Sequence, residues 1–242
     1  MPSIDEEGGL LHHGISRSLG IEIIDGVWPV GVGRTLEDVQ SRFGVSRTVA
    51  REASRQLEGM GLVRTKRRLG LVAQGIDSWS VLDTNLIDWR LHSTDRETQI
   101  YSLTQLRLAV EPAAAESAAR FASIHTRARL LPLASEMRRT GEAGQLEEFM
   151  EFDIEFHRLL LESCGNELFA ALANVVAVVL RGRTELGLMP AQPKPEALDG
   201  HEAVAQAVFN GDAEGARLAM QAVLEEVRLA FSDAVPHQRH LS

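Results

Sequence analysis

The chain has 242 residues, 44% of them hydrophobic, and carries a formal net charge of −9. This length suffices for two domains with substantial cores, and the acidic balance excludes a protein that coats nucleic acid through its overall charge. The single cysteine, Cys164, excludes an intramolecular disulfide. No signal-peptide pattern and no apolar run long enough to cross a membrane is present, so we expect a soluble cytoplasmic protein.

The charge is unevenly distributed along the chain. Residues 1–76 have a net charge of +1, whereas residues 77–242 have a net charge of −10. Between Arg42 and Arg68 there are eight basic residues and two acidic ones. A local basic window in an acidic chain is typical of a segment that contacts DNA.

The first elements are predicted from periodicity and capping signals. Residues 1–13 are polar, and we expect them to form a mobile tail. Apolar residues at helical spacing predict a helix over 14–25, which the segment VWPVG ends. Thr35 followed by Asp38 has the pattern of a capping box and predicts a short helix that runs to Phe43.

The stretch 44–65, GVSRTVAREASRQLEGMGLVRT, predicts an amphipathic helix capped by Ser46. At about 100° per residue, Arg47, Arg51 and Arg55 share one face, opposite an apolar stripe. Arg47 falls in the first turn, where a positive charge opposes the helix dipole, and this favours an anionic partner such as the DNA backbone. The alternative is an ordinary amphipathic helix with a solvated basic face.

Two short aliphatic runs, GLVRT and LGLVA, flank Lys66, Arg67 and Arg68 and predict a hairpin with a basic tip. The order helix, helix, turn, helix, hairpin is that of a winged helix-turn-helix, whose third helix enters the major groove. Three cations beside a cationic helix favour DNA binding over a merely solvated hairpin tip. We predict a DNA-binding domain over residues 14–74 and a linker over 75–80.

Residues 81–235 are predicted to form an all-α antiparallel helical bundle, so the fold class is mainly α. Helical periodicity covers 81–92, 97–122, 126–140, 145–163, 167–188, 199–210 and 212–232. Pro112 lies inside the second of these segments. Because an interior proline costs about 3 kcal/mol, we expect it to kink or break that helix.

A candidate metal site lies in this bundle. Asp153 and His157 are four residues apart and share one face of an amphipathic helix, and His201 is a candidate third ligand. Three nitrogen and oxygen ligands with open positions would suit zinc, nickel or manganese and would leave room for a carboxylate. The alternative is that Asp153 and His157 are polar residues at a helix edge, hydrogen-bonded to each other or to water.

The runs IDGVWPVG and LEDVQSRFGVSRTVAREASRQLEGMGLV, followed by a glycine in the wing, resemble the GntR family of bacterial transcription regulators. This resemblance implies DNA contacts on the third helix by Ser46, Arg47, Thr48, Val49 and Arg51, with Gly70 in the wing. The basic hairpin tip adds Arg67 and Arg68 as expected wing contacts. The chain departs from the family in two respects. Glu37 stands where many members have an arginine that contacts DNA, and the wing is one residue shorter after Gly70.

The second half is similar to the FCD ligand-binding domain found in the FadR branch of this family. The motifs that carry the similarity are RxxxE at Arg107 and Glu111, DxxFH at 153–157, GN at 165–166 and HxxxxxAxxxGD from His201 to Asp212.

The similarity implies a metal site of one aspartate and three histidines. Asp153, His157 and His201 supply three of these ligands, and Val223 occupies the fourth position. It also implies that Arg107 faces the pocket, where its guanidinium would hold an effector carboxylate. The alternative for Arg107 is a surface ion pair with Glu111.

We therefore expect a homodimeric repressor that binds an inverted-repeat operator and responds to a small carboxylic acid. The segment 79–91 resembles members that regulate sugar-acid use, which implies an aldonate or a related hydroxy acid as effector. Two other classes of function remain open. The first is a metal-dependent enzyme that acts on a small acid, although the sequence shows no evident motif for a general base or a nucleophile. The second is an architectural DNA-binding protein whose helical bundle binds no effector.

Overall fold

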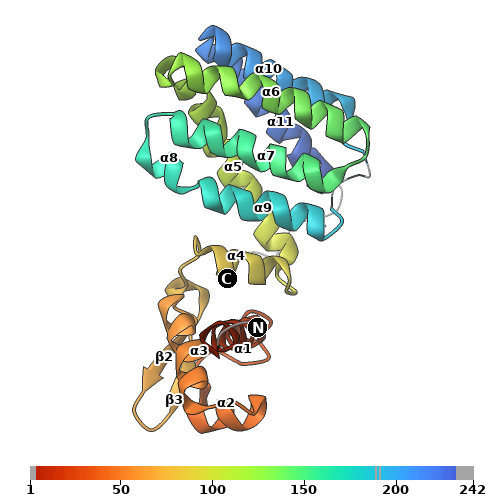
Figure 1. Ribbon diagram of the computed structural model, residues 1–242. Coiled ribbons are helices and arrows are strands. Elements are labelled where there is room, and N and C mark those ends of the chain that lie inside the picture. The colour runs from red at the N-terminus through yellow and green to blue at the C-terminus, as the bar shows by residue number, and fades with distance from the viewer. Residues whose placement is uncertain (1–3, 189, 191, 233–242) are drawn as a thin grey trace. The chain divides into compact units, whose positions relative to one another are not determined.

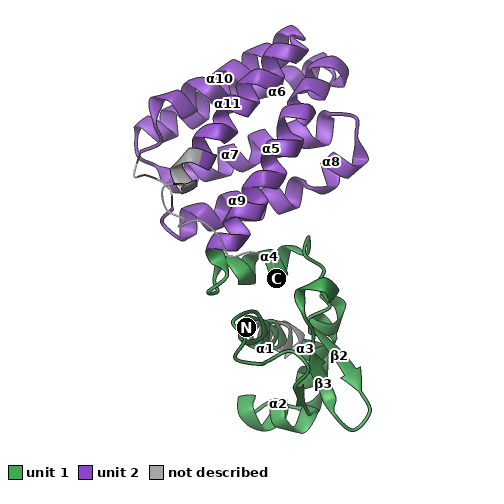
Figure 2. Ribbon diagram, turned by 180° about the vertical axis from the view of Figure 1, so that it is seen from behind, with its two compact units in different colours: residues 1–96 green, residues 97–242 purple. Residues whose placement is uncertain are grey.

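The computed structural model describes residues 4–188, 190 and 192–232. The chain divides into two compact units, residues 1–96 and 97–242 (Figure 2). The first unit combines helices with a small sheet, and every element described in the second unit is a helix (Figure 1). The predicted fold class, a winged helix-turn-helix followed by an all-α bundle, is confirmed.

The first unit consists of α1 (Ile4–Ile24), β1 (Gly33–Arg34), α2 (Leu36–Phe43), α3 (Arg47–Gly59), β2 (Val63–Lys66), β3 (Gly70–Ala73), the 3-10 helix η1 (Ile76–Ser78) and α4 (Thr84–Leu91). The strands form an antiparallel sheet in the order β1-β3-β2, with Lys66 opposite Gly70 at the hairpin turn. The predicted hairpin is present. Sequence analysis did not predict β1, because a strand of two residues has no periodicity to detect.

Local capping fixes the turn between α2 and α3. The amide of Asp38 donates to Thr35 Oγ1 at 3.1 Å and the amide of Thr35 donates to Asp38 Oδ2 at 2.7 Å, which is the predicted capping box. Gly44, with φ 64°, ends α2 in the left-handed conformation. Ser46 then begins α3, since its hydroxyl accepts a hydrogen bond from the amide of Val49.

Helix α4 belongs to the first unit, whereas the sequence analysis placed it in the helical bundle. Leu86 and Trp89 of α4 are buried in the same hydrophobic core as Leu19 of α1 and Leu57 of α3. Gly20 allows this packing, because a Cβ atom there would lie 2.4 Å from the Trp89 ring. The predicted boundary after residue 80 is therefore replaced by a division after residue 96.

The segment 75–80 is packed against the winged helix and is not a free linker. The indole of Trp79 donates to the carbonyl of Gln74 at 3.0 Å, and the amide of Ser80 donates to the carbonyl of Met60 at 2.8 Å. The expected mobile tail over 1–13 is helical from Ile4 onward, and residues 1–3 lie outside the described residues.

The second unit contains α5 (Arg96–Phe121, which begins at the last residue of the first unit), α6 (Ile124–Glu142), α7 (Leu146–Ser163), α8 (Glu167–Ala171), α9 (Ala173–Glu185), α10 (Pro195–Asn210) and α11 (Ala213–Ser232). Helix α6 packs against α7 and α10, α7 also packs against α9, and α10 packs against α11 (Figure 1). None of the described helices has the length and hydropathy needed to cross a bilayer.

Several helices of this unit differ from the sequence prediction. Helix α5 continues through Pro112 without a break. The proline removes one amide donor from the helix, and the burial of Ala114 and Ala115 in the core stabilises the turn that follows it. The segment predicted as one helix over 167–188 is divided into α8 and α9 at Leu172. Helix α10 begins at Pro195 instead of residue 199, and the predicted domain end at 235 lies outside the described residues.

Candidate functional site

Helix α3 exposes a basic face. Arg47 and Arg51 are exposed and form no ion pair with any side chain that the structure describes. Arg55, farther along the same helix, is paired with Glu52 at 2.6 Å. The opposite face is buried through Ala50, Ala53, Ser54 and Leu57. Two unpaired arginines near the start of an exposed helix are suited to bind phosphates and guanine edges.

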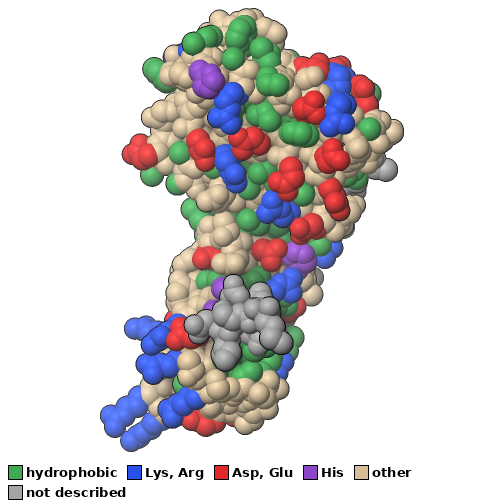
Figure 3. Space-filling view, viewed as in Figure 1, with side chains coloured by type: hydrophobic (Ala, Val, Ile, Leu, Met, Phe, Trp, Pro, Cys, Tyr) green, Lys and Arg blue, Asp and Glu red, His purple; other side chains and the backbone are tan. Residues whose placement is uncertain are grey.

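The wing supplies further cations. Arg67 and Arg68 are exposed at the tip of the β2–β3 hairpin, and Lys and Arg side chains gather over this hairpin and α3 (Figure 3). Gly70 has a structural role: its φ is 73°, and a Cβ atom there would lie 2.3 Å from the carbonyl oxygen of Arg34. Gly70 therefore lets β3 pair closely with β1 and sets the direction of the wing.

The remaining predicted DNA contacts, and the position where the chain departs from the family, differ in their exposure to solvent. Ser46 and Thr48 are exposed at the start of α3, and Val49 is half-buried. Glu37, which replaces a family arginine, is exposed on α2. Arg42 belongs to the basic window, but its two terminal guanidinium nitrogens, Nη1 and Nη2, donate to Glu22 of α1, so its charge is partly neutralised.

In the second unit, five polar side chains meet in the interior. We call this set the buried polar cluster, and it comprises Arg107 and Glu111 of α5, Asp153 and His157 of α7, and His201 of α10. None of the five is more than 7% exposed. Asp153 Oδ1 lies 3.2 Å from Nε2 of His157 and 3.3 Å from Nε2 of His201. The three residues predicted as metal ligands are therefore brought together.

The imidazole rings of His157 and His201 are each oriented by a contact of Nδ1, the nitrogen that faces away from Asp153. Nδ1 of His157 lies 2.6 Å from Glu111 Oε2, and Nδ1 of His201 lies 2.7 Å from the carbonyl oxygen of Ala197. Both rings consequently turn Nε2 toward Asp153. A carboxylate or carbonyl on the far nitrogen is the usual support of a histidine that binds a metal.

The atoms that face each other fit a divalent cation. Asp153, His157 and His201 each offer one ligand atom, and these atoms all lie within 4.8 Å of one another. Asp153 Oδ1 and His201 Nε2 are buried and have no hydrogen-bond partner among the described residues. A buried polar atom without a partner is costly, and a shared cation would satisfy both atoms.

Arg107 forms a buried ion pair, so the alternative of a surface pair with Glu111 is wrong. Its Nε lies 2.5 Å from Glu111 Oε1, and its Nη2 lies 3.3 Å from Glu111 Oε2 and 3.3 Å from Nε2 of His157. The guanidinium therefore faces the cluster, as the resemblance implied. Its Nη1 forms no hydrogen bond with the described part of the chain.

The charges of the cluster shift its ionisation. Burial acts to raise the pKa of Glu111, but Arg107 and His157 lower it to about 2. Burial acts to lower the pKa of His157, but Glu111 and Asp153 raise it to about 9. Without a metal, His157 is accordingly protonated at neutral pH, and a metal ligand at this position must first lose that proton.

Val223 lies on α11, next to the cluster-bearing helix α10. It is 5% exposed, and a Cβ atom on Gly200 would lie 2.6 Å from its Cγ2. Its aliphatic side chain cannot bind a metal. Val223 also lines a cavity of about 410 Å³ together with Lys194, Glu196, Gly200, Ala222 and Glu226.

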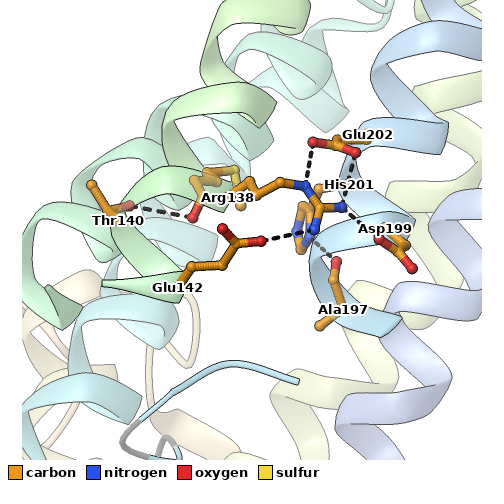
Figure 4. A network of polar contacts seen from close by, with 8 residues as sticks. Arg138, Thr140, Glu142, Ala197, Asp199, His201 and Glu202 are labelled. Atoms are coloured by element: carbon orange, nitrogen blue, oxygen red, sulfur yellow. Dashed lines mark hydrogen bonds and ion pairs between the residues drawn. The ribbon is translucent and has the colours of Figure 1, made fainter. Parts of the chain in front are cut away.

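An ion-pair network holds α10 against α6 on either side of His201. Arg138 of α6 binds Glu202 at 2.6 Å, also contacts Asp199, and lies 3.3 Å from Glu142 of its own helix (Figure 4). Hydrogen bonds to Glu202 and Asp199 raise the pKa of Arg138. Because Asp199 and Glu202 flank His201 in sequence, the network helps to fix where the imidazole enters the bundle.

Sequence reasoning missed two features of the site. Glu111 was considered only as the partner of Arg107, although it also supports His157. Arg183, a buried residue of α9, was not considered. It follows the aliphatic run of α9 and lies three residues after Leu180, so a cation on an apolar helix face was the available signal.

Comparison with known proteins identifies the second unit. The FCD domain family matches residues 102–226. The chain is 28% identical over 204 residues to the galactonate operon transcriptional repressor of Escherichia coli strain K12, covering 84% of this chain and 88% of the relative. It is 27% identical over 215 residues to the uncharacterized HTH-type transcriptional regulator YieP of the same strain, covering 88% and 92%.

The fold has a counterpart among solved structures. McbR/YncC of E. coli superimposes with a TM-score of 0.53 at 13% identity, covering 97% of this chain and all of that chain, which supports the fold alone. With the FCD domain and the winged helix-turn-helix both in place, the chain belongs to the FCD-containing, FadR-like branch of the GntR transcription regulators.

Proposed function

We propose that this regulator is a repressor that binds an inverted-repeat operator as a homodimer. The first unit supplies the DNA contacts, with Arg47 and Arg51 reading the major groove and Arg67 and Arg68 reaching the backbone or minor groove. Ser46, Thr48 and Val49 complete the contact surface at the start of α3, and Gly70 shapes the wing. The exposed, unpaired state of Arg47 and Arg51 is the observation that carries this assignment.

We infer that the second unit binds a small carboxylic acid and thereby changes operator affinity. Asp153, His157 and His201 would hold a divalent metal such as zinc, nickel or manganese, and Arg107 would bind the acid group. A bound cation would supply positive charge and open coordination positions for a carboxylate oxygen. The name of the galactonate operon repressor, a relative of this chain, supports a sugar acid as the effector class.

The proposal is tested by measuring binding of the purified full-length protein to DNA taken from upstream of its own gene. We expect an inverted-repeat fragment to bind in fluorescence anisotropy, and saturating sugar acids such as aldonates to weaken that binding. Prior treatment with a chelator should reduce the response to the acid. Operator binding that no acid alters would favour an architectural protein, and consumption of the acid would favour an enzyme.

A further inference from the structure

The outer half of the β2–β3 hairpin lies outside the hydrophobic core of the first unit. Strand β2 is at the edge of the sheet and pairs with β3 alone among the described strands (Figure 1). Val63 at the start of β2 is buried, whereas the three residues that follow it in the strand are exposed. The core therefore holds the base of the hairpin, but not the part that carries Arg67 and Arg68.

A side chain of α3 provides an anchor for this outer half. The backbone amide of Thr65, in β2, donates a hydrogen bond to Oε1 of Glu58 near the end of α3, at 2.8 Å. An amide on the free side of an edge strand would otherwise face water. A hydrogen bond to a carboxylate is stronger than one between neutral groups, so the contact ties β2 to α3.

Glu58 stands on the basic face of α3, where a negative charge is unfavourable for DNA binding. At about 100° per residue, Glu58 falls about 20° from Arg47 around the helix axis. Glu52, the other acidic residue of the basic window, is paired with Arg55 at 2.6 Å. Glu58 is exposed and forms no ion pair within the described part of the chain. Because an uncompensated carboxylate repels phosphates, its position on this face indicates a role other than charge.

The second strand of the hairpin is fixed separately, by its close approach to β1. A Cβ atom on Gly70 would lie 2.3 Å from the carbonyl oxygen of Arg34, and one on Gly33 would lie 2.4 Å from the carbonyl oxygen of Leu69. With Glu58 on the β2 side, the hairpin is held at both edges. A wing that is already oriented does not have to be ordered when DNA binds, and this favours affinity.

We propose that Glu58 is a positioning residue for DNA binding, which holds the wing in a fixed direction relative to α3 so that Arg67 and Arg68 reach the DNA together with the start of α3. This inference rests on the proposed function, because it takes the two wing arginines as DNA contacts. Glu58 makes no contact with the DNA in this arrangement. Its charge weakens binding, and its hydrogen bond to Thr65 outweighs that cost.

The test separates the charge of Glu58 from its hydrogen bond. Glu58→Gln removes the charge but keeps an oxygen that can accept from the amide of Thr65, whereas Glu58→Met removes both at similar length. Fluorescence anisotropy at one salt concentration measures the affinity of the full-length protein for a duplex that the wild-type protein selects from random DNA. If charge alone mattered, both variants would bind equally and more tightly than the wild-type protein.

We expect Glu58→Gln to bind at least as tightly as the wild-type protein and Glu58→Met to bind roughly fivefold more weakly than Glu58→Gln. Glu52 provides the matched control, because it lies on the same helix and is engaged with Arg55. Glu52→Gln and Glu52→Met should have equal affinities, since neither changes a contact of the wing.

A second control removes the cations that the wing presents. When Arg67→Ala and Arg68→Ala are both present, Glu58→Gln and Glu58→Met should bind equally, because the wing then has no arginine to place. General damage to the fold would instead weaken Glu58→Met in both backgrounds. The melting temperatures of all variants show directly whether they are folded.

Each outcome bears on one of the two proposals. Equal affinities of Glu58→Gln and Glu58→Met with the wing arginines present would overturn the positioning role and leave the DNA contacts in place. A difference that persists without Arg67 and Arg68 would also overturn it, because Glu58 would then act on α3 itself. If the loss of both wing arginines leaves operator affinity unchanged, the wing contacts of the proposed function are wrong, and the role of Glu58 fails with them.

Discussion

Nδ1 of His157 lies 2.6 Å from Oε2 of Glu111, and both side chains are 2% exposed. The contact joins α7 to α5 and fixes which nitrogen of the imidazole faces Asp153. In the proposed metal site, Glu111 would act through His157 and would not be a ligand itself. Residues in this position around a metal-binding histidine affect metal affinity by orienting the ring and increasing its basicity.

The first prediction is that Glu111→Gln lowers metal affinity about tenfold while Glu111→Ala lowers it further. The amide oxygen of Gln can still accept a hydrogen bond from Nδ1 of His157, but it carries no charge. Metal titration of chelator-treated protein by calorimetry measures the effect. Glu116→Gln is the control, because Glu116 lies on the same helix and forms a partly exposed pair with Arg120 at 2.6 Å. Equal affinities for all these proteins would remove Glu111 from the metal site.

The second prediction is that Val223→His increases metal affinity at least tenfold by adding a fourth ligand. Val223 is 5% exposed on α11, and α11 packs against α10, the helix that carries His201. Bound metal per chain and the melting temperature in the presence of zinc should both rise. Val223→Leu changes size without adding a ligand and serves as control. A melting temperature no higher than that of Val223→Leu would contradict the expected geometry.

The third prediction concerns the recognition helix. Arg47→Ala and Arg51→Ala should each weaken operator binding by about 1 to 3 kcal/mol if these side chains reach base edges. Neither should change thermal stability, since both side chains are exposed. Arg55→Ala should have a smaller effect, because Arg55 is already paired with Glu52. Anisotropy titrations over a range of salt concentrations give both the affinity and the number of phosphate contacts. Wild-type affinity in both variants would disprove the assignment.

The fourth prediction concerns pH and applies to chelator-treated protein. The pKa of His157 is about 9 in the folded state and about 6.5 when unfolded. A raised folded-state pKa gives stability that is complete below about pH 6.5 and is lost as the pH rises through 9. The groups facing His157 are Glu111, Asp153 and Arg107, and both carboxylates are ionised throughout this range.

The expected loss of unfolding free energy between pH 6.5 and pH 9 is on the order of 3 kcal/mol. Urea denaturation at several pH values measures it. His157→Gln should make the stability much less dependent on pH over that interval. Stability of the wild-type protein that rises over the interval would mean that His157 is neutral in the folded state.

The sequence was most informative where structure is local. The capping box of Thr35 and Asp38, the cap at Ser46 and the apolar stripe of α3 all lie within a few residues, so their pattern predicts the helix-turn-helix directly. The spacing of Asp153 and His157 likewise places both on one helix face. The pattern does not reveal where α4 packs, because Leu86 and Trp89 would suit either of two cores.

The contacts that orient the candidate metal ligands could not be predicted from the sequence for the same reason. The partner of Nδ1 in His157 is 46 residues away on α5, and the proximity of Arg183 to Arg107 depends on how α9 packs. A sequence shows that an ion pair between residues four apart is possible on one helix. Only the packing of the bundle shows that the pair of Arg107 and Glu111 is buried.

The last prediction addresses how the effector acts on DNA binding. The segment that leads from α4 toward α5 is tied to the DNA-binding unit, since Arg90 pairs with Asp95 at 2.6 Å and the amide of Thr94 donates to Asp25 of that unit at 2.9 Å. Because little free chain precedes α5, we expect a change in α5 to alter the placement of the recognition helices. To weaken operator binding a hundredfold, the effector must bind the DNA-incompetent state about 2.7 kcal/mol more tightly.

Arg107 lies on α5, so its removal should uncouple the acid from the operator. Because Arg107→Ala alone would leave the Glu111 carboxylate buried with one fewer partner, we would combine it with Glu111→Gln and use Glu111→Gln alone as the control. The double variant should bind the operator but show no release at acid concentrations that release the wild-type protein, whereas the control should retain part of the response. Anisotropy competition with increasing acid measures both. If the folded double variant releases DNA at the wild-type acid concentration, the acid group is bound elsewhere and the assignment of Arg107 is wrong.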